Sequence, residues 1–281
     1  MNLSDINTVR SLLQKNGFTF KKSLGQNFLI NPDVCPAMAD AACDKDTGVI
    51  EIGPGIGVLT AELSARAKRV IAIELDERLK KILPVTLADC ENVEIIYGDV
   101  LKTDLKALIA EKFSDCKRVA VCANLPYYIT SPIVMSLLES KLPIDSITVM
   151  VQKEAAARLC AKVGTREAGA VSVAVSYYAE PEILFGVDKG SFMPPPKVDS
   201  AVIQLHIREN PPVAVNDESK FFRLVKACFA QRRKTLVNTV SNTLGIDKEN
   251  IKKALSKLGL SETVRGERLT LEELAELSNL I

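Results

Sequence analysis

Between residues 47 and 207, short runs rich in Val and Ile alternate with helix-like segments, and this alternation constrains the fold more than any other feature of the chain. Strands that alternate with helices form a parallel sheet covered by helices. We therefore predict an α/β, doubly wound fold, with ligands beyond the carboxyl ends of its strands. The predicted strands are Val49–Ile52, Val70–Glu74, Val93–Tyr97, Arg118–Ala123, Ser146–Val151, Ile183–Val187 and Ala201–Ile207, and the predicted helices are Leu59–Arg66, Glu77–Ala88, Ser131–Ser140 and Lys153–Cys160.

A second, smaller domain is predicted after this region. Asn210-Pro211-Pro212 and Asn216-Asp217 interrupt the pattern as a linker does. The residues from Phe221 onward contain no strand signal and three or four helical segments, among them Lys248–Leu258 and a helix with a capped start at Thr270. We expect a larger domain at 1–209 and a small all-helical domain at 215–281.

Composition excludes several classes of protein. Of the 281 residues, 47% are hydrophobic and 25% are charged, as in an ordinary soluble globule. No apolar run is long enough to span a membrane and no secretory signal is present, so the expected location is the cytoplasm. The seven cysteines are scattered without a CxxC spacing, which predicts free thiols and no metal site. The single histidine, His206, lies within a strand pattern, which excludes catalysis by a histidine triad.

A glycine-rich turn follows the first predicted strand. Glu51-Ile52-Gly53-Pro54-Gly55-Ile56-Gly57 connects that strand to the next helix, and its glycines allow a ligand to approach the backbone closely. A dinucleotide fold would require G-x-G-x-x-G, but Val58 occupies the last glycine position and Pro54 removes an amide donor. These departures weaken a phosphate site, whereas S-adenosylmethionine carries no phosphate.

Two acidic residues end the next strands. Glu74 lies 21 residues after Gly53, where a carboxylate can bind both ribose hydroxyls. Asp99 follows the third strand and suits an adenine amino group. With the glycine turn, the two acids predict one site of adenosine shape.

The fourth predicted strand ends in Asn124-Leu125-Pro126-Tyr127-Tyr128. The N6 amine of adenine is a weak nucleophile until acceptors hold its hydrogens in a tetrahedral arrangement. The Asn124 side-chain oxygen and the Leu125 carbonyl are candidates for these acceptors. Pro126 fixes its own φ and brings no competing donor, and Tyr127 offers a π-face to the base.

Taken in order, these motifs give the chain a family resemblance. It resembles the ribosomal RNA adenine N6,N6-dimethyltransferases from about Lys21 through the C-terminal domain. The resemblance implies a Rossmann-like, S-adenosylmethionine-dependent methyltransferase sheet with a small all-helical C-terminal domain. The motifs that carry it are Lys21-Lys22-Ser23-Leu24-Gly25-Gln26-Asn27-Phe28-Leu29, Glu51-Ile52-Gly53-Pro54-Gly55, Glu74, Gly98-Asp99, Asn124-Leu125-Pro126-Tyr127-Tyr128 and Ser191-Phe192-Met193-Pro194-Pro195-Pro196-Lys197-Val198-Asp199-Ser200.

The resemblance also implies roles for individual residues. Phe192 would form a second aromatic wall around the extruded adenine, and Asn124, Leu125, Pro126 and Tyr127 would hold its amine. The cofactor would be bound by Gln26, Asn27, Leu29, Gly53, Gly55, Glu74, Asp99 and Asn124.

A basic cluster predicts where RNA binds. Residues 219–246 contain six basic residues and no acidic ones. If Lys220 to Thr239 is largely helical, one stripe carries basic side chains and the opposite face is apolar. The expected RNA-binding residues are Arg223, Lys226, Arg232, Arg233 and Lys234, with Lys21 and Lys22 as a weaker second patch.

The expected function is dimethylation of two adjacent adenosines in the 3′-terminal hairpin loop of small-subunit (16S) rRNA, by direct in-line transfer and with a role in small-subunit biogenesis. The expected partner is small-subunit rRNA or the immature small subunit, bound by a monomer. Three alternatives remain open. They are an antibiotic-resistance methyltransferase of large-subunit rRNA, which the sequence pI of about 7.5 disfavours, a mainly non-catalytic ribosome-assembly factor, and a nicotinamide oxidoreductase.

Overall fold

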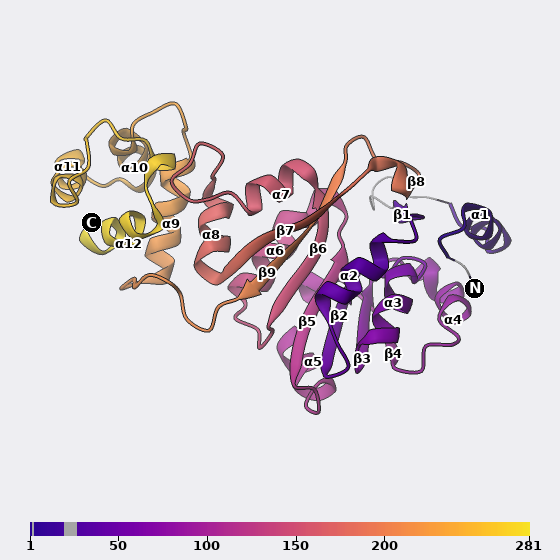
Figure 1. The fold of residues 1–281 in the computed structure, drawn as a ribbon. Helices are drawn as coiled ribbons and strands as arrows, with labels where there is room; N and C mark the ends of the chain where they lie inside the picture. The colour runs from indigo at the N-terminus through magenta and orange to yellow at the C-terminus, as the bar shows by residue number, and fades with distance from the viewer. Residues whose placement is uncertain (2, 20–26) are drawn as a thin grey trace. The chain divides into compact units, whose positions relative to one another are not determined.

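The computed structural model describes residues 1, 3–19 and 27–281. The chain divides into two compact units. The first unit comprises residues 1–156 and 182–207, and the second comprises residues 157–181 and 208–281. Figure 1 shows the course of the chain through both.

A seven-stranded sheet forms the first unit, and each predicted strand lies within one of its strands. They are β2 (Thr47–Ile52), β3 (Arg69–Glu74), β4 (Val93–Tyr97), β5 (Arg118–Asn124), β6 (Ser146–Gln152), β7 (Ala179–Val187) and β9 (Ser200–Ile207). Their order is β4-β3-β2-β5-β6-β9-β7. The strands from β4 to β6 are parallel, whereas β9 runs antiparallel to β6.

This order places a topological switch point between β2 and β5. From β2 the chain moves outward to β3 and β4, then returns to β5 on the other side of β2. In open α/β sheets the crossovers diverge at such a point and leave a crevice beyond the carboxyl ends of the strands. The glycine turn after β2 and the Asn124 turn after β5 both lie at this end of the sheet.

Helices α2 (Val34–Ala42) and α3 (Val58–Arg66) cover one face of the sheet (Figure 1). Met38 and Leu63, from these two helices, are fully buried with Val49, Val70 and Val202 from the strands. The alternation of strand and helix predicted that helices cover the sheet, because a β-branched sheet face must be covered by an apolar helix face. The helix over Leu59–Arg66 was among the predicted elements, whereas α2 was not. The other elements of this unit include α1 (Ile6–Lys15), α4 (Leu83–Thr86), α5 (Leu105–Lys112), α6 (Thr130–Glu139) and the start of α7 (Lys153–Leu159).

The prediction of one helix over Glu77–Ala88 was wrong. The segment forms a 3-10 helix, η2 (Glu77–Lys81), followed by the short helix α4. Pro84 lies in the first turn of α4. Proline has no amide hydrogen to donate to the preceding turn, so a continuous helix is interrupted there.

The second unit is helical and has its own core. Its elements are α8 (Ala170–Tyr178), α9 (Glu218–Phe229), α10 (Leu236–Leu244), α11 (Lys248–Lys257), the 3-10 helix η6 (Gly266–Arg268) and α12 (Leu271–Leu280). Phe221 is fully buried among Val173, Tyr177, Leu255 and Leu274. Because α8 contributes to this core, residues 157–181 belong with the helical residues after Ile207. The functional boundaries at 1–209 and 215–281 stay a prediction.

A single helical stripe of basic residues requires Lys220–Thr239 to be one helix, but the structure interrupts this segment. Helix α9 ends at Phe229, and α10 begins at Leu236 after a turn. Gly266 packs so closely on the end of α9 that a Cβ there would lie 2.4 Å from the Cys228 carbonyl oxygen. The side chains of Arg223 and Lys226 lie on α9, while Arg232, Arg233 and Lys234 lie in the turn, so the five do not form a single helical stripe.

Candidate functional site

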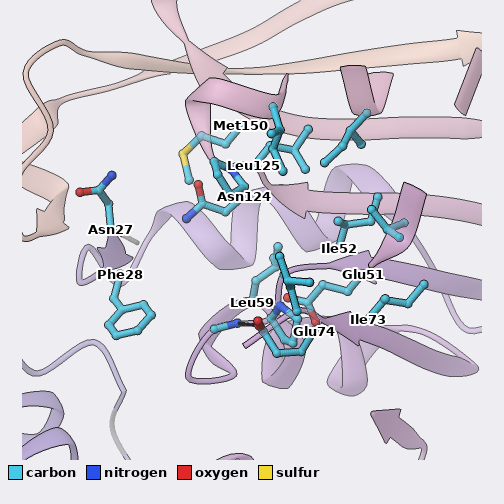
Figure 2. A pocket seen from close by; sticks show the side chains of 18 of the residues that line it. Asn27, Phe28, Glu51, Ile52, Leu59, Ile73, Glu74, Asn124, Leu125 and Met150 are labelled. Atoms are coloured by element: carbon cyan, nitrogen blue, oxygen red, sulfur yellow. Dashed lines mark hydrogen bonds between the residues drawn. The ribbon is translucent and has the colours of Figure 1, made fainter. Parts of the chain in front are cut away.

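A pocket opens at the carboxyl ends of β2, β3 and β5. Its empty volume is about 1180 Å³, open solvent at the mouth included. The glycine turn, Glu74, Asp99 and the segment Asn124–Tyr128 all line it. Figure 2 shows Asn124 and Glu74 on opposite sides of one opening, with Asn27 and Phe28 at its edge. The structure thus brings together in one pocket the two turns that the sequence analysis assigned to the cofactor and to the target amine.

The glycine turn adopts backbone angles that other residues rarely take. Gly53 has φ +71°, Gly55 +59° and Gly57 +92°. A Cβ at Gly55 would also lie 3.1 Å from the Phe28 ring. A side chain would therefore be strained at all three glycines and also crowded at Gly55 and Gly57, and the bare backbone of Gly53 and Gly55 forms part of the pocket wall.

The carboxylate of Glu74 fastens this turn to the end of β3. One oxygen accepts a hydrogen bond from the Gly55 amide at 3.1 Å, and the other accepts one from the Asp76 amide at 2.7 Å. Burial raises the pKa of Glu74, although these amides oppose that shift. Asp99 is more exposed, and one of its oxygens accepts a hydrogen bond from the Leu101 amide at 3.0 Å.

The turn after β5 is held by its neighbours. The Leu125 amide donates to the Met150 carbonyl of β6 at 3.3 Å. The Tyr127 hydroxyl lies 2.7 Å from the Ser200 hydroxyl. Tyr127 is half-buried in the pocket wall, whereas the neighbouring Tyr128 is 55% exposed.

Glu51 is a pocket residue to which the sequence analysis gave no role. It is 1% exposed, and its Oε2 atom has no hydrogen-bond partner among the described residues. Burial raises its pKa to about 8, and the nearby Glu74 carboxylate adds to this. A signal was available in the sequence, because an acid inside the apolar strand Val49-Ile50-Glu51-Ile52 must be buried.

The segment that precedes α2 forms another edge of the pocket. Asn27, Phe28 and Leu29 line it. Strand β1 (Phe28–Leu29) pairs antiparallel with β8 (Phe192–Met193). Gln26, Lys21 and Lys22 lie outside the described residues.

Phe192, for which the sequence analysis expected a place in the wall of the base site, is buried in the structure. Its side chain is 3% exposed and packs in the apolar cluster that contains Leu29, Val34 and Met38. It is not among the residues that line the pocket. Phe192 pairs with Leu29 across β8 and β1, and directly paired residues point to the same face, so both side chains lie in this cluster.

The basic residues of the second unit differ in their surroundings. Arg223, Lys226, Arg233 and Lys234 are exposed. Arg232 is exposed as well, but its guanidinium donates to the carbonyls of Arg166 at 2.5 Å and Ala168 at 2.8 Å, and it lies 3.9 Å from a Glu267 carboxylate oxygen. Arg232 thus ties the turn before α10 to the loop before α8.

Other chemistry is not supported in the part of the chain that the structure describes. All seven cysteines are free thiols, and His206 lies on β9, where Ser146 at the amino end of β6 is its partner. In residues 1, 3–19 and 27–281, no group of three or more His, Cys, Asp or Glu side chains is arranged to hold a metal ion. None of the described helices combines the length and the apolar character that a membrane span requires.

Comparison with known proteins gives full-length similarities. The family described as "Ribosomal RNA adenine dimethylase" matches residues 17–281. "Ribosomal RNA small subunit methyltransferase A" of Geobacillus thermodenitrificans is 52% identical over 276 residues, which cover 97% of this chain and 94% of that protein. The protein of the same name from Bacillus licheniformis is 51% identical over 274 residues, covering 96% and 94%.

Two solved structures are also similar. A dimethyladenosine transferase from Plasmodium falciparum is 26% identical with a TM-score of 0.70, and the match covers 89% of this chain and 95% of that one. The 23S rRNA methyltransferase ErmE is 28% identical with a TM-score of 0.69, covering 90% and 98%. Both similarities extend beyond the sheet into the helical unit.

Proposed function

The chain belongs to the ribosomal RNA adenine dimethylase family, and from this premise we propose that it dimethylates the N6 amines of adenosines in small-subunit rRNA. The observation that carries the proposal is the shared pocket, which is lined by Gly53, Gly55, Glu74 and Asp99 on the one hand and by the Asn124–Tyr127 turn on the other. We further propose two adjacent adenosines of the 3′-terminal hairpin loop as the targets.

S-adenosylmethionine is the proposed cofactor, and the residues present fit it. The Glu51 Oε2 atom is a buried polar atom without a hydrogen-bond partner among the described residues, and a polar group of a ligand would satisfy it. The backbone of Gly53 and Gly55 lines the pocket without side chains, which lets a ligand approach it closely. Glu74 would bind the ribose and Asp99 the adenine, while Asn27, Leu29, Gly53, Gly55 and Asn124 would line the rest. When bound, this cofactor supplies an electrophilic methyl group with a good leaving group.

The residues after β5 would prepare the amine that receives the methyl group. The Asn124 side-chain oxygen and the Leu125 carbonyl would accept its two hydrogens, which directs the nitrogen lone pair toward the donor. Leu125 is 1% exposed and tied to β6, so its carbonyl is held in place. Such positioning can supply roughly 7–11 kcal/mol of the barrier reduction. No strong base is required, because the proton leaves only after the methyl has moved.

The target base must leave its stack to reach this pocket. Extrusion costs a few kcal/mol and is least costly in a loop. The Tyr127 ring would compensate by stacking, which is worth about 1–3 kcal/mol per base. The half-buried position of Tyr127 in the pocket wall supports this role.

RNA binding is proposed for the helical residues 215–281. Arg223, Lys226, Arg233 and Lys234 are exposed and would contact phosphates. Arg232 has carbonyl partners within its own unit, so we assign it to holding the turn that presents Arg233 and Lys234.

The test is incubation of the protein with unmethylated small ribosomal subunits and with large subunits in the presence of labelled S-adenosylmethionine. Mass spectrometry should find dimethyladenosine only in small-subunit rRNA, in the 3′-terminal hairpin loop. Label in large-subunit rRNA alone would identify an enzyme of the resistance type. Specific binding to immature small subunits without any transfer would identify an assembly factor.

A further inference from the structure

The dipeptide Asp199-Ser200 ends the proline-rich motif and has no role in the account above. Ser200 is the first residue of β9, is fully buried, and pairs with Gln152 at the end of β6. A hydroxyl at a fully buried position loses its contacts with water, so a hydrogen bond must compensate for the loss.

The partner of this hydroxyl lies in the pocket wall. Tyr127 Oη and Ser200 Oγ are 2.7 Å apart, and either hydroxyl can donate. The two residues are 73 positions apart in the chain. The backbone of Tyr127 lies in the turn after β5, whereas the far end of its ring is held by Ser200 of β9.

Backbone and side-chain contacts of the neighbouring Asp199 hold the start of β9, and therefore Ser200, in place. The Asp199 carbonyl accepts a hydrogen bond from the Lys153 amide at 3.0 Å, which fastens β9 to the end of β6. The Asp199 carboxylate accepts one from the Lys189 amide at 3.1 Å. The backbone of the Tyr127 turn is held separately, by the Leu125 amide on β6 and by the Ile129 amide on the Pro126 carbonyl at 3.1 Å. Backbone contacts set where the turn lies, and Ser200 acts on the side chain alone.

We propose that Ser200 is a positioning residue that fixes the far end of the Tyr127 ring, and so the direction in which the ring extends beside the extruded adenine. This inference rests on the proposed function, because it requires a base to stack on Tyr127. Without the hydroxyl contact, the ring can swing about the Cα–Cβ bond. A stacked base would then move with the ring, and its amine would move away from the acceptors at Asn124 and Leu125. Even a small displacement of the reacting groups lowers the rate of methyl transfer substantially.

Four variants test the proposal. Ser200→Ala and Tyr127→Phe each remove one hydroxyl while keeping the Cβ and the ring, respectively. The third combines both changes. The matched control is Ser146→Ala, which removes a buried hydroxyl from the opposite end of the same β6–β9 ladder, where Ser146 pairs with His206.

We expect Ser200→Ala and Tyr127→Phe each to lower kcat roughly five- to tenfold, the effect of one lost hydrogen bond. The KM for S-adenosylmethionine should stay the same, the double variant should be no slower than either single one, and Ser146→Ala should match the wild type. An unchanged kcat in Ser200→Ala, a loss that multiplies in the double variant, or an effect confined to the cofactor KM would each overturn the proposal.

The contact can also be measured without activity. Denaturant unfolding of the same variants should show that the losses of stability from Ser200→Ala and Tyr127→Phe are not additive. Additive losses together with an unchanged kcat refute the inference and leave the proposed function intact. A wild-type protein that transfers no methyl group to either rRNA, yet shows coupling in unfolding, refutes the proposed function instead.

Discussion

The carboxylate of Glu74 accepts a hydrogen bond from the Gly55 amide, 19 residues earlier in the chain. This contact joins the end of β3 to the glycine turn after β2, and thereby fixes two walls of the pocket relative to each other. The oxygen that would bind a ribose hydroxyl is thus oriented before any ligand arrives, which lowers the cost of binding.

Replacement of Glu74 by alanine should weaken cofactor binding. The change removes two hydrogen bonds from the proposed ribose and releases the Gly55 amide, so we expect about 30- to 100-fold lower affinity. Isothermal titration with S-adenosylhomocysteine measures it. The control is Glu77→Ala, an exposed acid on η2 with a surface ion pair to Lys80. Equal affinity for the wild type and Glu74→Ala would rule out the ribose contact.

Glu51 should make the stability of the protein depend on pH. Its pKa is raised to about 8 in the folded protein by burial, while the unfolded chain ionises near the ordinary value of about 4.5. Between these values the unfolded state loses a proton that the folded state retains. The contribution of Glu51 is therefore fully favourable below pH 4.5 and is lost as pH rises toward 8.

The variant Glu51→Gln removes this titration. We compare the free energies of unfolding of this variant and of the wild type, both without cofactor. The difference, variant minus wild type, should increase by about 2–4 kcal/mol from pH 5 to pH 8, because only the wild type loses the contribution of Glu51. Denaturant unfolding at several pH values measures the difference, which cancels the titration of other groups. Parallel pH profiles for the two proteins would mean that Glu51 is ionised when buried.

Two roles for Phe192 can be distinguished by experiment: packing in the apolar core, or forming a wall of the site for the extruded base. Since its ring is 3% exposed in an apolar cluster, Phe192→Ala should cost about 3–4 kcal/mol of stability. Phe192→Leu should cost less than about 1.5 kcal/mol and retain most activity. A Phe192→Leu protein of normal stability with a large loss of kcat would support the aromatic wall that the sequence predicted.

The strands could be predicted from the sequence, whereas the burial of the Phe192 ring could not, and the difference has a physical reason. A strand such as Val70–Glu74 is predictable because its own β-branched residues favour extended backbone and burial on both faces. The orientation of the Phe192 ring depends on pairing with Leu29, a contact between residues that are far apart in the sequence. Local patterns contain no information about such a partner.

Helix α8 shows the same limit in secondary structure. Its sequence, Ala-Val-Ser-Val-Ala-Val-Ser-Tyr-Tyr, alternates as a strand does. The Gly169 amide donates to the Ser172 hydroxyl at 2.9 Å at the start of the helix, and Val173 and Tyr177, four residues apart, pack in the helical core. Tertiary packing therefore decides its conformation. The glycine turn after β2, by contrast, was predictable as a turn, because glycine spacing after a strand is local.

The last prediction separates RNA contact from structural support among the basic residues. Arg233→Glu with Lys234→Glu should weaken RNA binding and reduce the steepness of its salt dependence, since exposed cations release counterions from RNA. Arg232→Ala should instead lower stability by about 1–3 kcal/mol, because it leaves the Arg166 and Ala168 carbonyls without their donor. Filter binding of rRNA fragments at several salt concentrations measures the first effect, with Lys248→Glu combined with Lys253→Glu on α11 as the charge-matched control. A salt slope that is unchanged by the Arg233 and Lys234 reversals, or that changes as much with the Lys248 and Lys253 reversals, would show that the turn before α10 does not contact phosphate.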